Sequence, residues 1–233
     1  GGTYDGDGTK WDYRRVSFFG RVNYNYNDRY LIQATVRSDG SSKFGADNRW
    51  GVFPSIAVGW RICEEEFFPK GIALNNLKLR ASWGRLGNEN ALGYYDFLAL
   101  ISTYNTKYQG YVKGNGDNAW AGSIARGLEN RSLKWETTDT KNIGLDFGFF
   151  NNRLTGEIDY YNKYTSDILY HPELYLSMGV VGSAPENLGE VRNRGVEFTL
   201  NWNDRIGKDF EYRVGMNVSF LSLIHISEPT SRT

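Results

Sequence analysis

Apolar and polar side chains alternate along most of this chain with a period of two residues rather than 3.6. Residues 16–26 place Val, Phe and Tyr on one face and mainly Ser, Arg and Asn on the other. The same alternation recurs over residues 30–37, 55–61, 77–84, 142–149, 154–161, 195–202 and 210–220. Such alternation predicts β-strands with one apolar and one polar face. We therefore expect eight strands, with one or two more within residues 93–112, or about 8–10 in total.

The connections between these segments fall into two kinds. Residues 26–30, 150–154 and 202–206 each read aromatic, Asn, Asn or Asp, Arg, apolar. Asn and Asp tolerate the left-handed backbone of tight hairpins, so these three segments are predicted turns. Other connections are long, at about residues 38–48, 87–131 and 170–192. We expect the short turns, together with a solvated connection at Glu64–Glu66, to lie on one rim and the long loops on the other.

Strand length and loop asymmetry favour a membrane barrel. Two alternating runs, residues 16–26 and 210–220, exceed ten residues, and about 9–11 tilted residues span a bilayer. Short turns on one rim and long loops on the other are typical of outer-membrane barrels. The predicted fold class is therefore all-β, part of a large antiparallel transmembrane β-barrel. A soluble β-sandwich that serves as a binding or adhesion module also alternates in this way, and a passive porin is a further alternative.

Composition supports strands and excludes several functions. Aromatic residues make up 15% of the chain, with 27 Gly and only 5 Pro, which suits long strands joined by turns. The 27 Lys and Arg balance the 27 Asp and Glu, so there is no electrostatic basis for nucleic-acid binding. The mean hydropathy of −0.54 is compatible with a barrel, because alternation averages apolar with polar positions. The single Cys63 excludes an intrachain disulfide.

No motif for catalysis or metal binding is present in the sequence. The G-x-S-x-G, G-x-x-x-x-G-K-S/T and G-x-G-x-x-G patterns are absent. His171 and His225 have no partner at ligand spacing. Residues 5–9 begin like a calcium loop, but Lys10 stands where Gly is needed and Val16 where the closing Glu is needed. We expect no enzymatic activity, no cofactor and no metal.

A series of motifs occurs in order along the chain. They are DRYL at 28–31, RSDGSSKFG at 37–45, NRWGVFPS at 48–55, GWRI at 59–62, LKLRASWGRLGN at 77–88, LKWE at 133–136, NIGLD at 142–146 and NRGVE at 193–197. Together they closely resemble the C-terminal barrel half of the SusC/RagA family of TonB-linked outer-membrane importers. The resemblance covers about residues 13–220 and is specific because many motifs keep their order.

This resemblance implies a barrel of roughly 22 strands, of which the chain supplies somewhat under half. It implies that a signal peptide, a TonB box and a plug precede this segment in the whole protein. It also implies a location in the outer membrane of a Gram-negative bacterium, in contact with lipid. The implied partners are a SusD-like lipoprotein and the TonB complex, and the implied cargo is a glycan or a peptide.

The end of the chain departs from this family. Alternation stops near Phe220, and residues 221–233 read LSLIHISEPTSRT, which is similar to translated sequencing-adapter read-through. We expect this tail to be non-native, the alternative being a genuine short strand followed by a polar tail. The predicted organisation is therefore a partial barrel at residues 1–220 and a doubtful tail at 221–233.

The largest predicted loop contains the candidate substrate-binding residues. These are Tyr94, Tyr95, Tyr104, Tyr108, Tyr111 and Trp120. Flat aromatic rings stack on sugars or peptide side chains and lose little rotamer entropy when they do. We expect these rings to contact substrate, the alternative being that they pack the loop itself or contact the lid lipoprotein.

Overall fold

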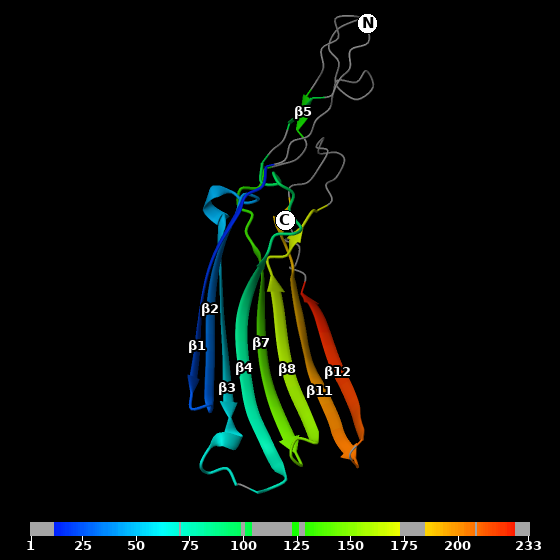
Figure 1. Cartoon of the computed structure of the whole chain (residues 1–233). Coiled ribbons are helices and arrows are strands. Elements are labelled where there is room, and N and C mark those ends of the chain that lie inside the picture. The colour runs from blue at the N-terminus through cyan, green and yellow to red at the C-terminus, as the bar shows by residue number, and fades with distance from the viewer. Residues whose placement is uncertain are drawn as a thin grey trace, which may run out of the picture.

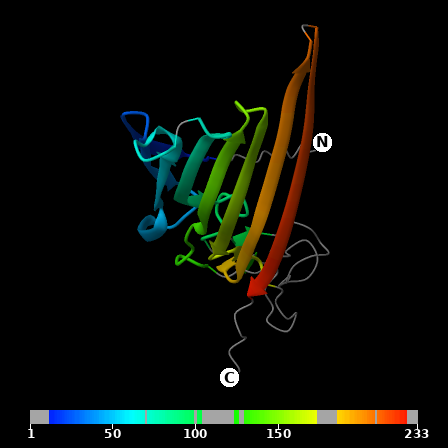
Figure 2. The same ribbon diagram turned by 90° about the horizontal axis from the view of Figure 1, so that it is seen from below.

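One antiparallel sheet of eight strands dominates the computed structural model, which describes residues 12–69, 71–98, 101–103, 123–125, 129–172, 185–207 and 209–226. Its strands are β1 (Arg15–Tyr26), β2 (Tyr30–Ser41), β3 (Trp50–Arg61), β4 (Leu74–Asn88), β7 (Glu136–Phe149), β8 (Leu154–Ser166), β11 (Glu190–Ile206) and β12 (Phe210–Ile226). Each strand pairs with the next in that order, so β1 and β12 are the two edges of an open wall (Figures 1 and 2). The predicted eight long strands are confirmed.

Smaller elements lie in the connections. β5 (Ile101–Thr103) pairs with β6 (Ser123–Ala125), and β9 (Leu169–Tyr170) pairs with β10 (Glu186–Asn187). The described residues also form two short 3₁₀ helices, η1 (Ala46–Asn48) and η2 (Ile62–Glu64). Within the described ranges, no helix has the length and apolar character needed to cross a membrane.

The two rims differ as predicted, with one correction. The turns after β1, β7 and β11 lie at the lower rim in Figure 1 together with the β3–β4 connection at residues 62–73, and the connections after β2, β4 and β8 lie at the upper rim. Asn27 and Asp28 have φ of 49° and 54°, and Asn151 and Asn152 have φ of 57° and 61°, so both turns use left-handed Asn or Asp. The predicted third turn at residues 202–206 is wrong, because β11 continues through these residues and turns at Gly207 with φ of 69°. Glycine adopts that backbone without steric cost.

The strand register separates an apolar face from a polar face across the whole sheet. One row of paired residues on the apolar face reads Tyr24, Ile32, Val58, Ala81, Ile143, Tyr160, Val196, Phe220. The row one residue away, on the polar face, reads Asn23, Gln33, Ala57, Ser82, Asn142, Tyr161, Gly195, Leu221. The alternating pattern of eight separate segments therefore merges into two continuous surfaces.

The apolar face is uncovered. Val22, Ile143 and Phe220 are 69%, 57% and 70% exposed, although a soluble sandwich would bury such side chains between two sheets. In Figure 2 the sheet is a single layer of strands. The soluble β-sandwich is excluded by this arrangement, because its defining second sheet would have to lie on this face.

Aromatic rings mark both ends of the apolar face on β3. Near the long-loop rim Trp50 stacks on Phe18 with ring centroids 6.1 Å apart, and near the short-turn rim Trp60 stacks on Tyr30 at 6.4 Å. Ten residue steps at about 3.3 Å, tilted by about 40°, separate the two Trp residues by about 25 Å along the barrel axis. An apolar band of about 25 Å between aromatic girdles is characteristic of outer-membrane barrels.

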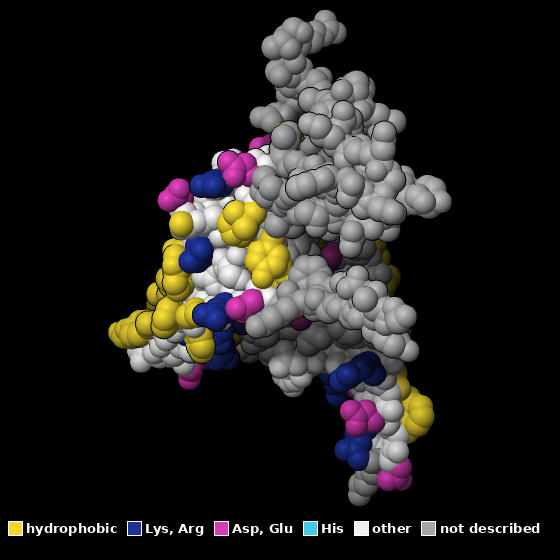
Figure 3. Space-filling model, turned by 90° about the horizontal axis from the view of Figure 1, so that it is seen from above, with side chains coloured by type: hydrophobic (Ala, Val, Ile, Leu, Met, Phe, Trp, Pro, Cys, Tyr) yellow, Lys and Arg dark blue, Asp and Glu magenta, His cyan; other side chains and the backbone are white. Residues whose placement is uncertain are grey.

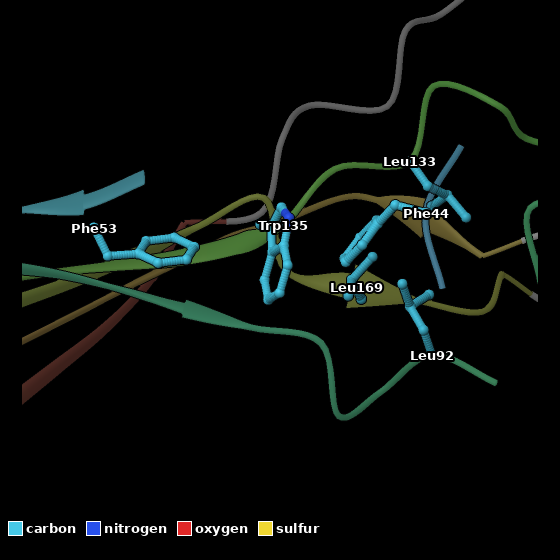
Figure 4. Packing of buried hydrophobic residues seen from close by; sticks show 6 residues of the cluster. All are labelled: Phe44, Phe53, Leu92, Leu133, Trp135 and Leu169. Atoms are coloured by element: carbon cyan, nitrogen blue, oxygen red, sulfur yellow. The ribbon is translucent and has the colours of Figure 1, made fainter. Parts of the chain in front are cut away.

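The buried apolar side chains of the described residues gather at the long-loop rim. They are Phe44, Phe53, Leu92, Leu133, Trp135 and Leu169 (Figure 4). The ring of Trp135 lies 4.7 Å from that of Phe44 and 5.5 Å, edge-on, from that of Phe53. A side chain at Gly51 or Gly87 would collide with the ring of Phe53. This small core therefore fixes the bases of three long loops against the end of the wall.

The last strand does not stop where the alternation stops. β12 continues to Ile226, and Leu221 and Leu223 pair with Gly195 and Asn193 of β11. These two leucines lie on the polar face and are 66% and 52% exposed. After Phe220, apolar side chains therefore occupy both faces of β12. Backbone pairing continues because ladder hydrogen bonds do not depend on side-chain polarity. The non-native origin of residues 221–233 stays a prediction.

Candidate functional site

The polar face is hollowed. A depression of about 480 Å³ is bordered by Asn25, Gln33, Lys78, Arg80 and Asn142. In Figure 3, charged side chains lie on the inner side of the visible ends of the wall and hydrophobic ones on the outer side. Amide, ammonium and guanidinium groups on a concave surface suit contact with water or with a polar occupant rather than with lipid.

An arginine joins three strands on this polar face. Arg80 on β4 donates from Nε to Asp146 on β7 at 2.7 Å and from Nη2 to Asp159 on β8 at 3.1 Å. The guanidinium crosses Gly144, where a Cβ would collide with the Asp159 carboxylate and lie 2.9 Å from the Arg80 Cζ. Glycine at that position therefore permits one cation to neutralise two carboxylates. The sequence shows each charge on the polar side but not the register that brings them together.

A second charged network lies at the long-loop rim. Asp39 is only 3% exposed, and it accepts a hydrogen bond from Arg37 Nε at 2.8 Å and one from Arg15 Nη2 at 3.3 Å. Arg15 also lies 3.6 Å from Glu89, which follows β4. Buried carboxylates are stable only when paired in this way. The network ties the end of β2 to β1 and to the start of the largest loop.

Tyr94 lies in an aromatic and cationic patch beside that network. Tyr13 donates a hydrogen bond to Glu89 at 2.6 Å, and burial together with this carboxylate raises the pKa of the Tyr13 hydroxyl. Lys43 Nζ lies 5.7 Å from the ring centroids of both Tyr13 and Tyr94, and it donates to the carbonyl of Leu92 at 2.7 Å. The cation therefore holds two rings that are distant in sequence on one surface.

The predicted substrate-binding residues divide into two groups. Tyr94 is 38% exposed at the long-loop rim, with its ring 5.8 Å from that of Tyr13, whereas Tyr95 is half-buried and its carbonyl accepts a hydrogen bond from Leu98. The remaining four predicted residues, Tyr104, Tyr108, Tyr111 and Trp120, lie outside the described residues. Contact of these six residues with substrate stays a prediction. The sequence pattern did not single out Tyr13, Lys43 or Glu89, whose proximity depends on the fold.

The short-turn rim contains a third polar cluster. Glu65 accepts hydrogen bonds from the Tyr30 hydroxyl at 2.7 Å and from Trp60 Nε1 at 2.9 Å, and it lies 3.6 Å from Arg29. The hydrogen bond from Tyr30, followed by that from Trp60, lowers the pKa of the Glu65 carboxyl. The predicted position of Glu64–Glu66 on this rim is confirmed. Their predicted solvation holds for Glu66, which is 91% exposed, but not for Glu65, whose side chain is 11% exposed.

These features define a class of protein. A curved antiparallel wall with an uncovered apolar exterior, aromatic girdles and a polar concave interior is part of a large β-barrel. The chain belongs to the TonB-dependent receptor-like β-barrel family, whose model matches residues 1–230. The resemblance to SusC and RagA found in the sequence is confirmed by this family and by the relatives and solved structures that the chain matches.

Individual relatives agree with this assignment. The chain is 41% identical over 205 residues to the TonB-dependent receptor SusC of Bacteroides thetaiotaomicron, a match that covers 88% of the chain and 20% of SusC. It is 36% identical over 204 residues to the TonB-dependent receptor P3 of Formosa agariphila, again covering 88% of the chain and 20% of that receptor. The chain thus spans about a fifth of the length of these relatives.

Solved structures share the same fold. The RagAB peptide importer in its closed-closed state superposes with a TM-score of 0.80 at 29% identity, over 94% of this chain and 23% of that one. The siderophore receptor PirA from Pseudomonas aeruginosa superposes with a TM-score of 0.54 at 14% identity, over 90% of this chain and 35% of that one, which shows a common fold alone.

Proposed function

We propose that this chain is part of the barrel wall of a TonB-dependent importer in the outer membrane of a Gram-negative bacterium. The observation that carries the proposal is the sheet with an uncovered apolar exterior and a polar concave interior. Its apolar band of about 25 Å matches the hydrocarbon height that an outer-membrane barrel covers. The similarity to SusC, to receptor P3 and to the RagAB peptide importer supports the same function.

The two faces have different tasks in this proposal. The apolar face contacts lipid, and neighbouring strands of the wall satisfy one another's backbone groups along their paired registers, as hydrocarbon requires. The polar face, with Arg80 and its two aspartates, lines the interior through which cargo passes and against which a plug rests. Energy comes from the TonB complex, which engages a part of the importer outside this chain.

The long-loop rim is the proposed cargo side. Tyr94 and Lys43 offer an aromatic face next to a cation, which suits the stacking and hydrogen-bonding groups of a glycan or a peptide. A SusD-like lipoprotein is the proposed lid, and the similarity to RagAB, a peptide importer, makes peptides one of the two cargo classes. Neither part of this proposal requires a catalytic residue.

Uptake measured in the native host tests the function. Deletion of the full-length gene is expected to abolish growth on one class of nutrient, either a glycan or a peptide mixture, and the tagged protein is expected in the outer-membrane fraction. Removal of TonB should abolish the same uptake. Uptake that persists without TonB would instead establish the passive porin, and recovery of the protein in the soluble fraction would refute both.

A further inference from the structure

A cationic patch interrupts the apolar face on β4, β7, β8 and β11. Its members share the outward side of their strands and are Trp83, Arg85, Asp139, Lys141, Asn162, Tyr164, Glu190, Arg192 and Arg194. Seven of these residues border a depression of about 250 Å³. We propose that this patch binds the phosphate of an anionic lipid headgroup in the leaflet on the long-loop side. This proposal rests on the membrane location proposed above.

The patch lies where the membrane surface should cross these strands. One row of paired residues on the outward face begins with apolar side chains, namely Ala34 on β2, Ile56 on β3 and Trp83 on β4. On the following strands the same row is polar or cationic. On β7, β8 and β11 it continues as Lys141, Asn162 and Arg194. Strands of a barrel tilt by about 35–45°, so a ladder row climbs obliquely through the membrane. The row leaves the hydrocarbon after β4, and its cations therefore stand at headgroup height.

The charge of the patch favours an anion. Arg85 forms a two-point pair with Asp139 at 3.1 and 2.8 Å, which neutralises that carboxylate. The carboxylate of Glu190 interacts with the Tyr164 hydroxyl. Four cations thus face two carboxylates, and both carboxylates already have a partner within the patch. A surplus of two positive charges beside an apolar band matches the negative surface of a membrane.

Three cationic side chains of the patch have no carboxylate partner among the described residues. Arg192 lies over the Tyr164 ring, 5.1 Å from its centroid, and its enclosed Nε makes no hydrogen bond within the described residues. Lys141 and Arg194 are exposed and form no ion pair in the part of the chain that the structure describes. Guanidinium and ammonium groups are the donors that bind phosphate oxygens most strongly. Lys141 and Arg192 border one depression, and Arg194 pairs with Asn162, which also borders it. This clustering explains why charges are tolerated on an otherwise apolar face.

Lipid titration of the full-length receptor in neutral detergent tests the proposal. Phosphatidic acid, which has a free phosphate, and diacylglycerol, which lacks one, form a matched pair of probes for native mass spectrometry. We expect phosphatidic acid to bind and diacylglycerol not to bind. Each cation near such a surface contributes about five-fold in affinity, so K141Q/R194Q should weaken phosphatidic acid binding about thirty-fold.

Controls separate this site from general charge effects. K163Q/R21Q removes the same charge from the polar face of the wall, and phosphatidic acid should bind it as the unchanged receptor does. The variant K141R/R194K keeps both charges and should retain binding, and K141Q/R194Q should keep the heat-modifiable electrophoretic mobility of the folded barrel, which excludes misfolding as the cause of a loss. Equal binding by K141Q/R194Q and the unchanged receptor would overturn the proposal. So would displacement of the lipid by millimolar inorganic phosphate, which would indicate a site for free phosphate, or occupation of the patch by a second copy of the receptor.

The two proposals fail differently. A receptor that resides in the outer membrane and imports nutrient, but shows no preference for phosphatidic acid over diacylglycerol, refutes only the lipid site. A protein recovered without detergent from the soluble fraction refutes the importer and the lipid site together.

Discussion

Placing a charge at the centre of the apolar face tests which side of the wall contacts lipid. Ile56 lies on β3 between the two aromatic girdles, six residues from Trp50 and four from Trp60, and its side chain is 44% exposed. Its ladder neighbours on the same face are Ala34 and Trp83. We expect Ile56→Arg in the full-length receptor to destabilise the folded barrel strongly.

The magnitude follows from the depth of the site. Arginine at the bilayer midplane costs a β-barrel about 2–4 kcal/mol, and the loss of isoleucine from lipid adds about 0.3–0.6 kcal/mol. The expected loss is therefore about 3 kcal/mol, or roughly a 150-fold decrease in the ratio of folded to unfolded protein. On a soluble protein, the same exposed position would change stability by less than about 0.5 kcal/mol.

Ala57 provides a matched control because it is the next residue on the same strand and borders the hollow on the polar face. Ala57→Arg places the same guanidinium in a wet environment and should cost less than about 1 kcal/mol. The assay is urea unfolding of the receptor reconstituted in phosphatidylcholine vesicles, followed by its electrophoretic mobility without boiling. Equal destabilisation by both substitutions, or a neutral Ile56→Arg, would refute the orientation of the wall.

Four further predictions concern Arg80, Glu65, Trp120 and the isolated chain. Arg80→Met leaves the carboxylates of Asp146 and Asp159 unpaired, each about a fifth exposed, and should destabilise the reconstituted receptor by about 1–2 kcal/mol in urea unfolding. Adding D146N/D159N to Arg80→Met should reverse this loss of stability. The pKa of the Glu65 carboxyl is lowered below its ordinary 4.5, so its stabilisation of the short-turn rim is complete above pH 4.5 and is lost as the pH falls through the folded-state pKa. Acidification should therefore change the fluorescence of Trp60, and this change should vanish in E65Q. Trp120→Ala should weaken cargo binding by the full-length receptor several-fold in calorimetry, and unchanged affinity would remove this residue from the site. Residues 1–220 expressed alone should aggregate or require detergent, since both edges of the wall are unpaired, and a monodisperse cooperative product without detergent would contradict this.

Local pattern determined much of this fold. The side of the sheet on which each residue lies follows from its parity along the strand, so alternation alone assigns Val22 and Asn23 to opposite faces. The turns at Asn27–Asp28 and Asn151–Asn152 were predictable because short polar side chains stabilise left-handed backbone locally. The third turn was predicted wrongly because the Asn–Asp–Arg motif at 203–205 competes with Gly207, which adopts the left-handed backbone at lower cost.

The sites were less accessible to sequence reasoning. Tyr94 was predicted from its chemistry, but its neighbours Tyr13 and Lys43 come from segments 81 and 51 residues earlier in the chain. Trp135 likewise packs on Phe44 across a long loop. Contacts between segments so far apart depend on how the loops fold back on the wall, which no local spacing encodes.

The sequence by itself thus determined which residues lie on the apolar face and which on the polar face, because side-chain direction in a strand repeats every two residues. Only the tertiary structure decided the register between strands. That register places Arg80 between two aspartates on different strands, and it carries one ladder row from Ile56 in the apolar band to Arg194 in the cationic patch. A shift by two residues would preserve every face while breaking each of these pairs, so alternation alone leaves them undetermined.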